Sequence, residues 1–401
     1  MTSRDTAVES TATPDRVAVV GGGRWARVIL DVLCDLLPMH VALTVHTRAG
    51  GAVREWQAEH PRRNRIELGE SLPATDVGAV IVANAARDHV AAAESALRAG
   101  SFVLVEKPLT PRFAATRDLL NRAAATGGRL AAAHVFLFAR YVENFAAAMA
   151  VAGRPEAVEF IWTDPALEER HGEVKRYDAG LTVFADWLPH VLPILATFLP
   201  AWPASARLSA VRGGGAEVDL ELEGTGVPCQ VHLARNAAGR RRILQVRAAG
   251  EMCELDFSTE PGTLSVGGTA RDADPEWATC RRPLARMLAA FLAWSAGATR
   301  DPRLDPAAGL RCSQLVEELD AAYRISSGRW LAARLATAAP IDAAAAYALA
   351  ELLQREGRWT AAEATAEIAA LSGRCVGPAA LTGNSPAAQF LRAFVSDNLP
   401  A

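Results

Sequence analysis

Residues 16–136 alternate short apolar runs with longer segments whose apolar residues recur every three or four positions. The short runs lack polar alternation, which is typical of strands that are buried on both faces. They span residues 17–20, 41–45, 79–83, 102–105 and 130–135. Helices are predicted between them at 24–37, at about 88–99, and from Thr110-Pro111 to Gly127-Gly128. This alternation predicts a parallel sheet with helices on both faces.

From about residue 155 the pattern changes. In residues 216–223, Val218, Leu220 and Leu222 alternate with acidic residues, which predicts a strand with one solvated face. Three similar strands are predicted at 230–235, 243–247 and 252–257, and two helices at 284–296 and 307–326. These elements indicate a second α/β domain that is built on a mostly antiparallel sheet.

The pattern divides the 401 residues into four parts. Residues 1–15 are polar and are predicted to be a disordered tail. Residues 16–136 are predicted to form the first domain, built on the parallel sheet, and residues 137–330 the second domain. Residues 331–401 are rich in alanine and form a helical extension, with helices near 342–355 and 360–371.

Composition narrows the class of protein. A net charge of −3 gives no reason to expect a nucleic acid or an anionic membrane as a partner. The six cysteines form no Cys-x-x-Cys pair, so neither a metal site nor a disulfide framework is predicted. The first fifteen residues contain no apolar core of a signal peptide, and no apolar run reaches the length of a membrane span. We therefore expect a cytoplasmic protein.

A glycine-rich turn follows the first predicted strand. The segment Gly21-Gly22-Gly23-Arg24-Trp25-Ala26 has the pattern G-x-G-x-x-A and lies between a strand and a helix, as dinucleotide binding requires. Gly21 would allow the tight turn, Gly23 the close approach of the backbone to a pyrophosphate, and Ala26 the packing of helix on strand. The pyrophosphate would lie at the N-terminus of the helix.

The end of the second strand indicates which dinucleotide is bound. NAD-binding proteins usually carry an acidic residue here, which holds the ribose hydroxyls. This strand instead ends in Val45-His46-Thr47-Arg48. Because an arginine matches the geometry of phosphate oxygens, Thr47 and Arg48 favour the 2′-phosphate of NADP. NAD remains the alternative.

Lysine is scarce in this chain. Among 42 lysines and arginines only Lys107 and Lys175 are lysines. Lys107 directly follows an apolar strand, in the segment Glu106-Lys107-Pro108. Unlike arginine, lysine has a pKa that burial can move, so this placement indicates chemistry.

Several segments together resemble the Gfo/Idh/MocA family, which includes glucose–fructose oxidoreductase and inositol dehydrogenases. The matching segments lie within residues 16–330: they are the glycine turn, residues 76–84 with Asn84 and the nearby His89, residues 99–109 with Glu106-Lys107-Pro108, residues 245–256 and residues 305–328. The resemblance implies a Rossmann domain and a second domain with an open sheet, which often joins subunits into a homodimer or homotetramer. It also implies that Lys107 lies beside the nicotinamide and the substrate, with Glu106, Asn84 and His89 near the cofactor.

The family also carries an Asp-x-x-x-His pair, which matches Asp186 and His190. This spacing puts both side chains on one face of a helix, where His190 could transfer a proton and Asp186 could orient it. Pro189 and Pro193 would each remove a backbone hydrogen bond, so we expect a kink here. Trp187, Lys175 and Tyr177 are the further candidates for substrate contacts.

These features predict an NADP-dependent oxidoreductase. It would transfer hydride between nicotinamide and a carbonyl or carbinol carbon of a small molecule, namely a sugar, a sugar nucleotide or a cyclic polyol. One alternative is a reductase of imines or ketones in natural-product biosynthesis, which the aromatic residues Trp187, Phe136 and Phe138 favour. Another is a non-catalytic sensor or scaffold that binds NADP.

Overall fold

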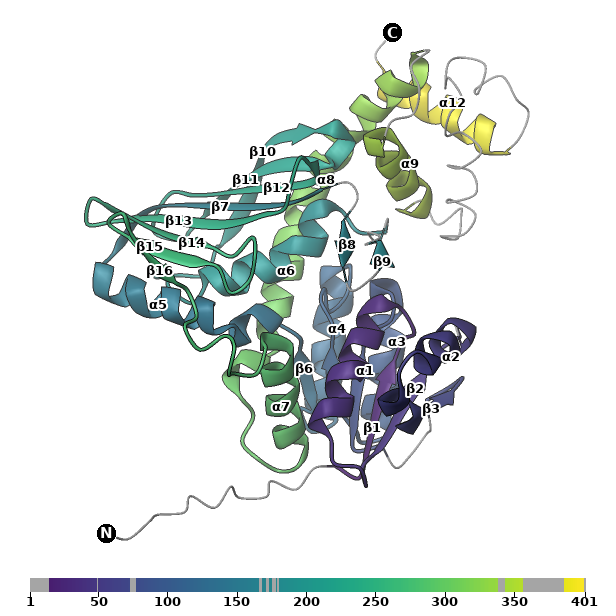
Figure 1. The fold of residues 1–401 in the computed structure, drawn as a ribbon. Helices are drawn as coiled ribbons and strands as arrows, with labels where there is room; N and C mark the ends of the chain where they lie inside the picture. The colour runs from purple at the N-terminus through teal and green to yellow at the C-terminus, as the bar shows by residue number, and fades with distance from the viewer. Residues whose placement is uncertain are drawn as a thin grey trace. The chain divides into compact units, whose positions relative to one another are not determined.

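The computed structural model describes residues 14–48, 50–72, 77–165, 168–170, 173–174, 178, 180–337, 343–355 and 386–399. The predicted helix at 360–371 and most of the predicted N-terminal tail lie outside these residues. The chain divides into two compact units (Figure 1). The first unit consists of residues 1–110, 114–139 and 279–310, and the second of residues 111–113, 140–278 and 311–401.

The first unit is built on a parallel sheet of six strands, in the order β3-β2-β1-β4-β5-β6. The strands are β1 (Arg16–Val20), β2 (Ala42–His46), β3 (Ile66–Gly69), β4 (Ala79–Val82), β5 (Phe102–Val105) and β6 (Leu130–Ala132). The chain starts at the middle of the sheet, builds outward to β3, and then crosses to β4 on the other side of β1. Such a reversal places the ends of β1 and β4 at a switch point, where ligands bind in open α/β sheets.

Helices cover both faces of this sheet, as the apolar runs predicted. Val17 and Val19 of β1 point to a core with α1 (Arg24–Leu36), α2 (Gly50–Ala58) and α7 (Pro283–Ser295). Ala18 of the same strand points to the opposite core, with α3 (His89–Arg98) and α4 (Phe113–Ala125). Successive residues of a strand face opposite sides, so one strand serves both cores.

The first unit includes a segment that the sequence pattern placed in the second domain. Helix α7 buries Leu284, Met287, Leu288 and Phe291 in the core beside α1. The apolar residues of α7 lie on one face, as expected for a helix. This pattern does not specify the core against which that face packs. The first unit therefore also contains residues 279–310, whereas the sequence predicts that it ends at residue 136.

Local details of the first unit also differ from the prediction. Helix α2 and strand β3 were not predicted, and α4 begins at Phe113 and not at Pro111. The strand predicted to end at Val135 stops at Ala132, and residues Val135–Phe138 form the 3-10 helix η3.

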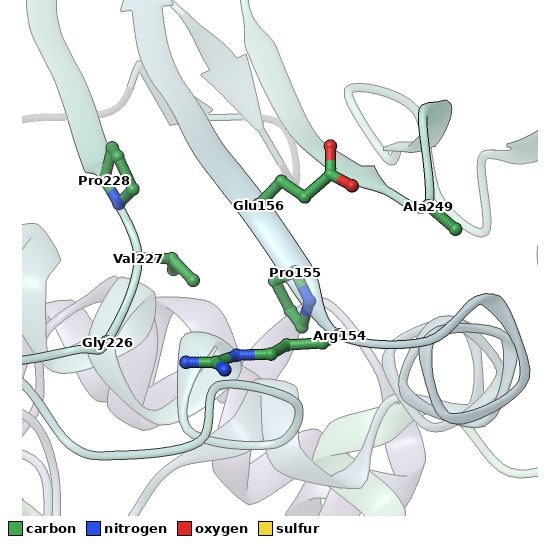
Figure 2. A pocket seen from close by; sticks show the side chains of 7 residues that line it. All are labelled: Arg154, Pro155, Glu156, Gly226, Val227, Pro228 and Ala249. Carbon is green, nitrogen blue, oxygen red and sulfur yellow. The ribbon is translucent and has the colours of Figure 1, made fainter.

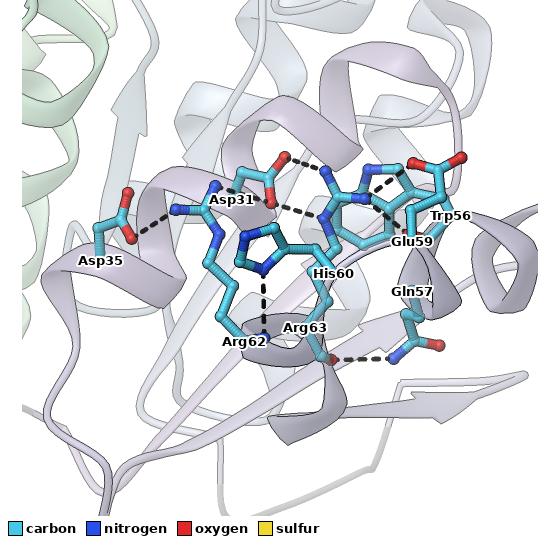
Figure 3. Close-up of polar contacts among 8 residues, drawn as sticks. All are labelled: Asp31, Asp35, Trp56, Gln57, Glu59, His60, Arg62 and Arg63. Atoms are coloured by element: carbon cyan, nitrogen blue, oxygen red, sulfur yellow. Dashed lines mark hydrogen bonds and ion pairs between the residues drawn. The ribbon is translucent and has the colours of Figure 1, made fainter.

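A polar cluster braces helix α1 (Figure 3). Arg63, in the 3-10 helix η1 (Pro61–Arg65), donates to both carboxylate oxygens of Asp31 at 2.9 and 3.0 Å. Its guanidinium lies 4.2 Å from the ring centroid of Trp56 in α2 and also pairs with Glu59. Arg63 therefore joins α1 to the α2–η1 segment, away from the glycine turn that precedes α1.

The second unit is built on a mixed sheet of eight strands, in the order β10-β11-β12-β7-β13-β14-β15-β16. Every pairing is antiparallel except that of β12 with β7. The strands are β7 (Pro155–Pro165), β10 (Ser205–Arg212), β11 (Glu217–Glu223), β12 (Cys229–Ala237), β13 (Arg241–Ala248), β14 (Glu251–Asp256), β15 (Thr263–Val266) and β16 (Thr269–Asp272). The predicted open, mostly antiparallel sheet is thus confirmed.

Helices α5 (Arg140–Ala152) and α6 (Val183–Leu195) pack on this sheet, α5 near β14 and β15, and α6 near β11 and β12. In β11 the apolar residues Val218, Leu220 and Leu222 are buried, whereas the acidic residues between them are more accessible. This alternation matches the predicted solvated face.

The helical extension continues from a long helix. Helix α8 (Ala307–Ala336) passes through residue 330, so the boundary predicted there falls inside a helix. Leu331 and Leu335 of α8 form a small core with α9 (Ala343–Arg355) and α12 (Pro386–Asn398). In the described part of the chain, no helix is both long and apolar enough to cross a membrane.

Candidate active site

The glycine turn connects β1 to α1 in a conformation that requires glycine at position 21. Gly21 has φ +131°, and a Cβ atom there would lie 2.6 Å from the carbonyl oxygen of Ala83. The Gly21 N–H donates to the carbonyl of His46 at 2.9 Å. The turn is therefore packed tightly between the ends of β2 and β4, because any larger residue would displace the backbone after β4.

The space around the turn is suited to an anion. A Cβ atom on Gly22 would meet Thr47 Oγ1 at 2.6 Å, but one on Gly23 would meet no atom within 4 Å. Gly23 is the N-cap of α1, no side chain caps it, and the first turn of the helix contains no acidic residue. Open space in front of uncapped backbone N–H groups fits the pyrophosphate of a dinucleotide. Ala26 is fully buried, whereas Arg24 and Trp25 are half-buried.

Charged residues lie at the ends of the strands that flank β1. Arg48 follows β2, and Asp88 ends the 3-10 helix η2 (Ala86–Asp88) after β4. The Arg48 guanidinium lies 3.5 Å from the Asp88 carboxylate, and the Arg48 side chain is 90% exposed. Because β2 and β4 are the neighbours of β1, this pair joins the two loops on either side of the glycine turn.

Both ring nitrogens of His89 lie within hydrogen-bonding distance of backbone carbonyl groups. His89 is buried, with Nδ1 2.9 Å from the carbonyl oxygen of Pro108 and Nε2 3.2 Å from that of Asn84. A neutral imidazole can donate only one of these hydrogen bonds, and an imidazolium can donate both. His89 thus ties the loop after β4 to the loop after β5, which contains Lys107.

Lys107 lies two residues after the end of β5, at the carboxyl end of the parallel sheet, and is half-buried. The Lys107–Pro108 peptide bond is cis. The neighbouring Glu106 is buried, and its Oε2 accepts a hydrogen bond from the Lys107 N–H at 3.2 Å. Burial raises the pKa of the Glu106 carboxyl, and a hydrogen bond from Trp25 and the charge of Lys107 oppose this rise.

In the second unit, Asp186 and His190 lie one turn apart on α6. The helix starts at Val183, and the side chain of its N-cap Thr182 accepts a hydrogen bond from the Ala185 N–H at 3.1 Å. It remains helical through Pro189 and Pro193, although a kink was expected. Both side chains are half-buried.

Two arginines and a tryptophan beneath this helix were missed by sequence reasoning. Arg235 of β12 is buried and lies 3.4 Å from the Asp186 carboxylate. Trp162 of β7 stacks on the His190 imidazole at 5.4 Å between ring centroids, with 15° between the planes. Arg242 of β13 lies 4.1 Å from the Trp162 centroid. In the sequence, the only sign of these contacts is that an arginine lies inside a strand. The strand register decides which face of the sheet that arginine occupies.

The remaining candidates differ in their surroundings. Trp187 is 2% exposed and packs near Trp162 and Arg242, so it lies in the core of the second unit. Lys175 and Tyr177 lie outside the described residues.

A surface pocket of about 540 Å³ in the second unit contains none of the candidate residues (Figure 2). It is lined by Arg154, Pro155, Glu156, Gly226, Val227, Pro228 and Ala249. Pro155 begins β7, and Trp162 lies seven residues further along the same strand, which corresponds to roughly 23 Å. The pocket is therefore separate from the Asp186 and His190 region.

The doubly wound sheet and its glycine turn define the class of the first unit, which is a dinucleotide-binding Rossmann domain. Residues 16–134 match the model of the Gfo/Idh/MocA family, described as an oxidoreductase family with an NAD-binding Rossmann fold. This match confirms the resemblance that the motifs indicated, over the residues it covers. No curated protein sequence matches the chain.

Solved structures share the fold over most of the chain. The UDP-N-acetylglucosamine 3-dehydrogenase of Acidithiobacillus ferrooxidans is 20% identical, covers 78% of this chain and 98% of its own, and has a TM-score of 0.62. A 3-ketoreductase from Actinomadura kijaniata, solved with TDP-benzene and NADP, is 20% identical over 77% of this chain and 97% of its own, with a TM-score of 0.60. An oxidoreductase from Agrobacterium radiobacter, solved with NAD⁺, L-tartaric acid and magnesium, is 16% identical over 78% and 96%, with a TM-score of 0.62. At these identities the likeness concerns the fold alone.

Proposed function

We propose that this protein is an NADP-dependent oxidoreductase that acts on a carbonyl or carbinol carbon of a sugar, a sugar nucleotide or a cyclic polyol. The observation that carries the proposal is the glycine turn, which is fixed by Gly21 and opens at Gly23 in front of the N-terminus of α1. The family match over residues 16–134 supports it. Two similar structures are a sugar-nucleotide 3-dehydrogenase and a 3-ketoreductase solved with NADP, which favours substrates of this kind.

The residues of the first unit would bind and orient the dinucleotide. Backbone N–H groups of residues 21–26 would hold the pyrophosphate, and Thr47 and Arg48 the 2′-phosphate. The bound nicotinamide supplies or accepts the hydride. Lys107, at the carboxyl end of β5, would donate a hydrogen bond to the substrate oxygen and stabilise the charge that develops on it.

The residues of the second unit would handle the proton. His190 would give a proton to the substrate oxygen during reduction, or remove one during oxidation. Asp186 would bind a substrate hydroxyl or orient the imidazole, and Arg235, 3.4 Å away, would hold its carboxylate in place. Of the three aromatic residues that favour the imine-reductase alternative, Trp187 and Phe138 are buried, whereas Phe136 is half-buried.

We infer a homo-oligomer that assembles through the face of the second sheet that carries Asp219 and His232. His232 Nδ1 and Asp219 Oδ1 are 2.6 Å apart, and the two side chains are 30% and 33% exposed.

Loss of NADPH absorbance with a panel of keto-sugars, nucleoside-diphosphate keto-sugars and inososes tests the activity. For a substrate that turns over, we expect Lys107→Ala to lower kcat about 100-fold or more, the effect of removing an acid–base or charge-stabilising group. Lys107→Arg should also be impaired, because arginine keeps the charge but not the compact ammonium. NADPH binding, followed by protein fluorescence, should stay within a few-fold of wild type.

The roles assigned here are wrong if Lys107→Ala and His190→Ala both turn over within a few-fold of wild type. A protein that binds NADPH but reduces none of these compounds would instead point to a sensor or scaffold.

A further inference from the structure

A buried arginine lies next to Trp162 because of strand register. Strands β7 and β13 pair so that Arg242 is directly opposite Trp162, and neighbouring side chains in such a pair lie on the same face. Arg242 is 2% exposed, and its guanidinium lies 4.1 Å from the Trp162 ring centroid. The Arg242 guanidinium therefore packs on the Trp162 indole and is shielded from solvent.

The charge of Arg242 is compensated inside the sheet. Its guanidinium pairs with Asp164, which is fully buried, and donates to the backbone carbonyl of Thr163. Burial lowers the pKa of Arg242 to about 10, and the charge of Asp164 opposes this shift, so the guanidinium stays charged near neutral pH. Buried ion pairs add little net stability compared with apolar residues of similar size. A role in orientation accounts for the pair better than a role in stability.

Trp162 in turn contacts His190. The two ring planes are 15° from parallel, and the ring centroids are 5.4 Å apart. Trp162 is 2% exposed and comes from a central strand of the sheet, whereas His190 comes from α6, which packs on that sheet. The indole thus presents a rigid surface to one face of the imidazole.

We propose that Trp162, held by the Arg242–Asp164 pair, is a positioning residue that fixes the plane of the His190 imidazole and favours its protonated form. The role of His190 in proton transfer rests on the proposed function, but its stacking on Trp162 does not.

The described residues that pack around His190 include the charged groups of two ion pairs. From its own helix comes Asp186, which pairs with Arg235 of β12. From β7 and β13 come Asp164 and Arg242, which neutralise each other. Helix α8 contributes two titratable groups that pack against α6. The Tyr323 ring contacts Phe184, and the Cys312 thiol lies 4.0 Å from the carbonyl oxygen of Leu188.

The indole acts on His190 through its π-face, on which the imidazole stacks. A protonated imidazole that stacks on the face of a tryptophan gains from the cation–π interaction. This gain applies to the protonated form only, so it moves the midpoint of titration upward by roughly half a pH unit.

Nuclear magnetic resonance of the histidine rings in the full-length protein tests this inference without a substrate. In wild type, the ring protons of His190 should be shifted upfield by the indole ring current, and those of His232 should not. His190→Asn assigns the resonance. In Trp162→Leu we expect the upfield shift to disappear and the His190 midpoint to fall by roughly half a pH unit. In Trp162→Phe, which keeps an aromatic ring, the His190 midpoint should fall by a smaller amount.

The proposal is overturned if the His190 ring protons of the wild-type protein show no upfield shift. This test does not depend on whether Trp162→Leu folds. An unchanged or higher midpoint in a folded Trp162→Leu would also overturn the proposal. If a substrate is found, the limb of the kcat/KM profile that reports His190 should move with the midpoint. A shift in the NMR titration without turnover on any substrate would refute the proposed function and leave the positioning role intact.

Discussion

At the scale of single residues, the atoms around each position determine which residues the glycine turn accepts. Gly21 is required because Ala83 leaves no room for a Cβ atom, whereas Gly23 faces open space. Arg48 is almost fully exposed and lies 3.5 Å from Asp88, a pair that contributes little stability by itself. Its significance would lie in binding, because a 2′-phosphate would compete with Asp88 for the guanidinium.

We therefore predict that Arg48→Ala weakens NADPH binding by about tenfold, since an arginine–phosphate contact contributes roughly 1.4 kcal/mol or more. NADH has no 2′-phosphate, so its Kd should change by less than threefold. Titration of protein fluorescence with each cofactor measures both values.

The matched variant is Asp88→Asn, which removes the competing carboxylate and should tighten NADPH binding. If Arg48→Ala weakens NADH and NADPH equally, Arg48 does not contact the 2′-phosphate, and the preference for NADP has to be abandoned.

At the scale of elements, helix α6 shows how packing overrides local propensity. A proline inside a helix costs about 3 kcal/mol, and α6 contains Pro189 and Pro193. The same helix buries Phe184, Leu188, Leu192 and other apolar residues, each contributing about 1.5–3 kcal/mol. The burial of its apolar side chains outweighs the lost hydrogen bonds, so the helix continues and keeps Asp186 and His190 one turn apart.

The start of α6 depends on one side chain. Thr182 caps the helix through the Ala185 N–H, and we expect Thr182→Ala to lower the free energy of unfolding by about 1 kcal/mol. Thr182→Ser keeps the hydroxyl oxygen and should stay close to wild type. Urea unfolding followed by tryptophan fluorescence compares the variants, and equal stability of the alanine and serine variants would show that the cap contributes nothing.

At the scale of the whole molecule, the alanine-rich extension is part of the second unit. Gly214, in the 3-10 helix η4 (Gly213–Gly215), has φ +65°, and a Cβ atom there would lie 2.5 Å from the Trp330 ring and 2.9 Å from Ala348 of α9. The Tyr323 hydroxyl donates to Glu351 of α9 at 2.8 Å, and both residues are buried. Tyr323 also packs edge-on against Phe184 of α6, 5.1 Å away. The extension is thus linked to the helix that carries His190 through a single intervening side chain.

Removing one partner of this hydrogen bond should leave the other unsatisfied. We expect Tyr323→Phe and Glu351→Leu each to lower the free energy of unfolding by about 1–3 kcal/mol, and the double variant to lose less than the sum. Thermal and chemical denaturation of the four proteins measures this coupling. Strict additivity would mean that the hydrogen bond does not join α9 to α8 in solution.

The sequence by itself determined the parts of this protein that depend on local pattern. Uninterrupted apolar runs specify buried strands, so β1, β2, β4 and β5 were predicted within a residue or two of their bounds. The G-x-G-x-x-A turn and the strand before Lys107 were likewise readable, because the backbone itself supplies the chemistry there.

Only the tertiary structure decided which side chains meet. Strand register places Arg242 opposite Trp162 and aims Arg235 at Asp186, and no local pattern encodes that pairing. The same holds for α7, which enters the core of the first unit, and for His89, which contacts the loops after β4 and β5. Periodicity specifies the face of an element that is buried. The partner that covers this face depends on contacts between residues that are distant in the sequence.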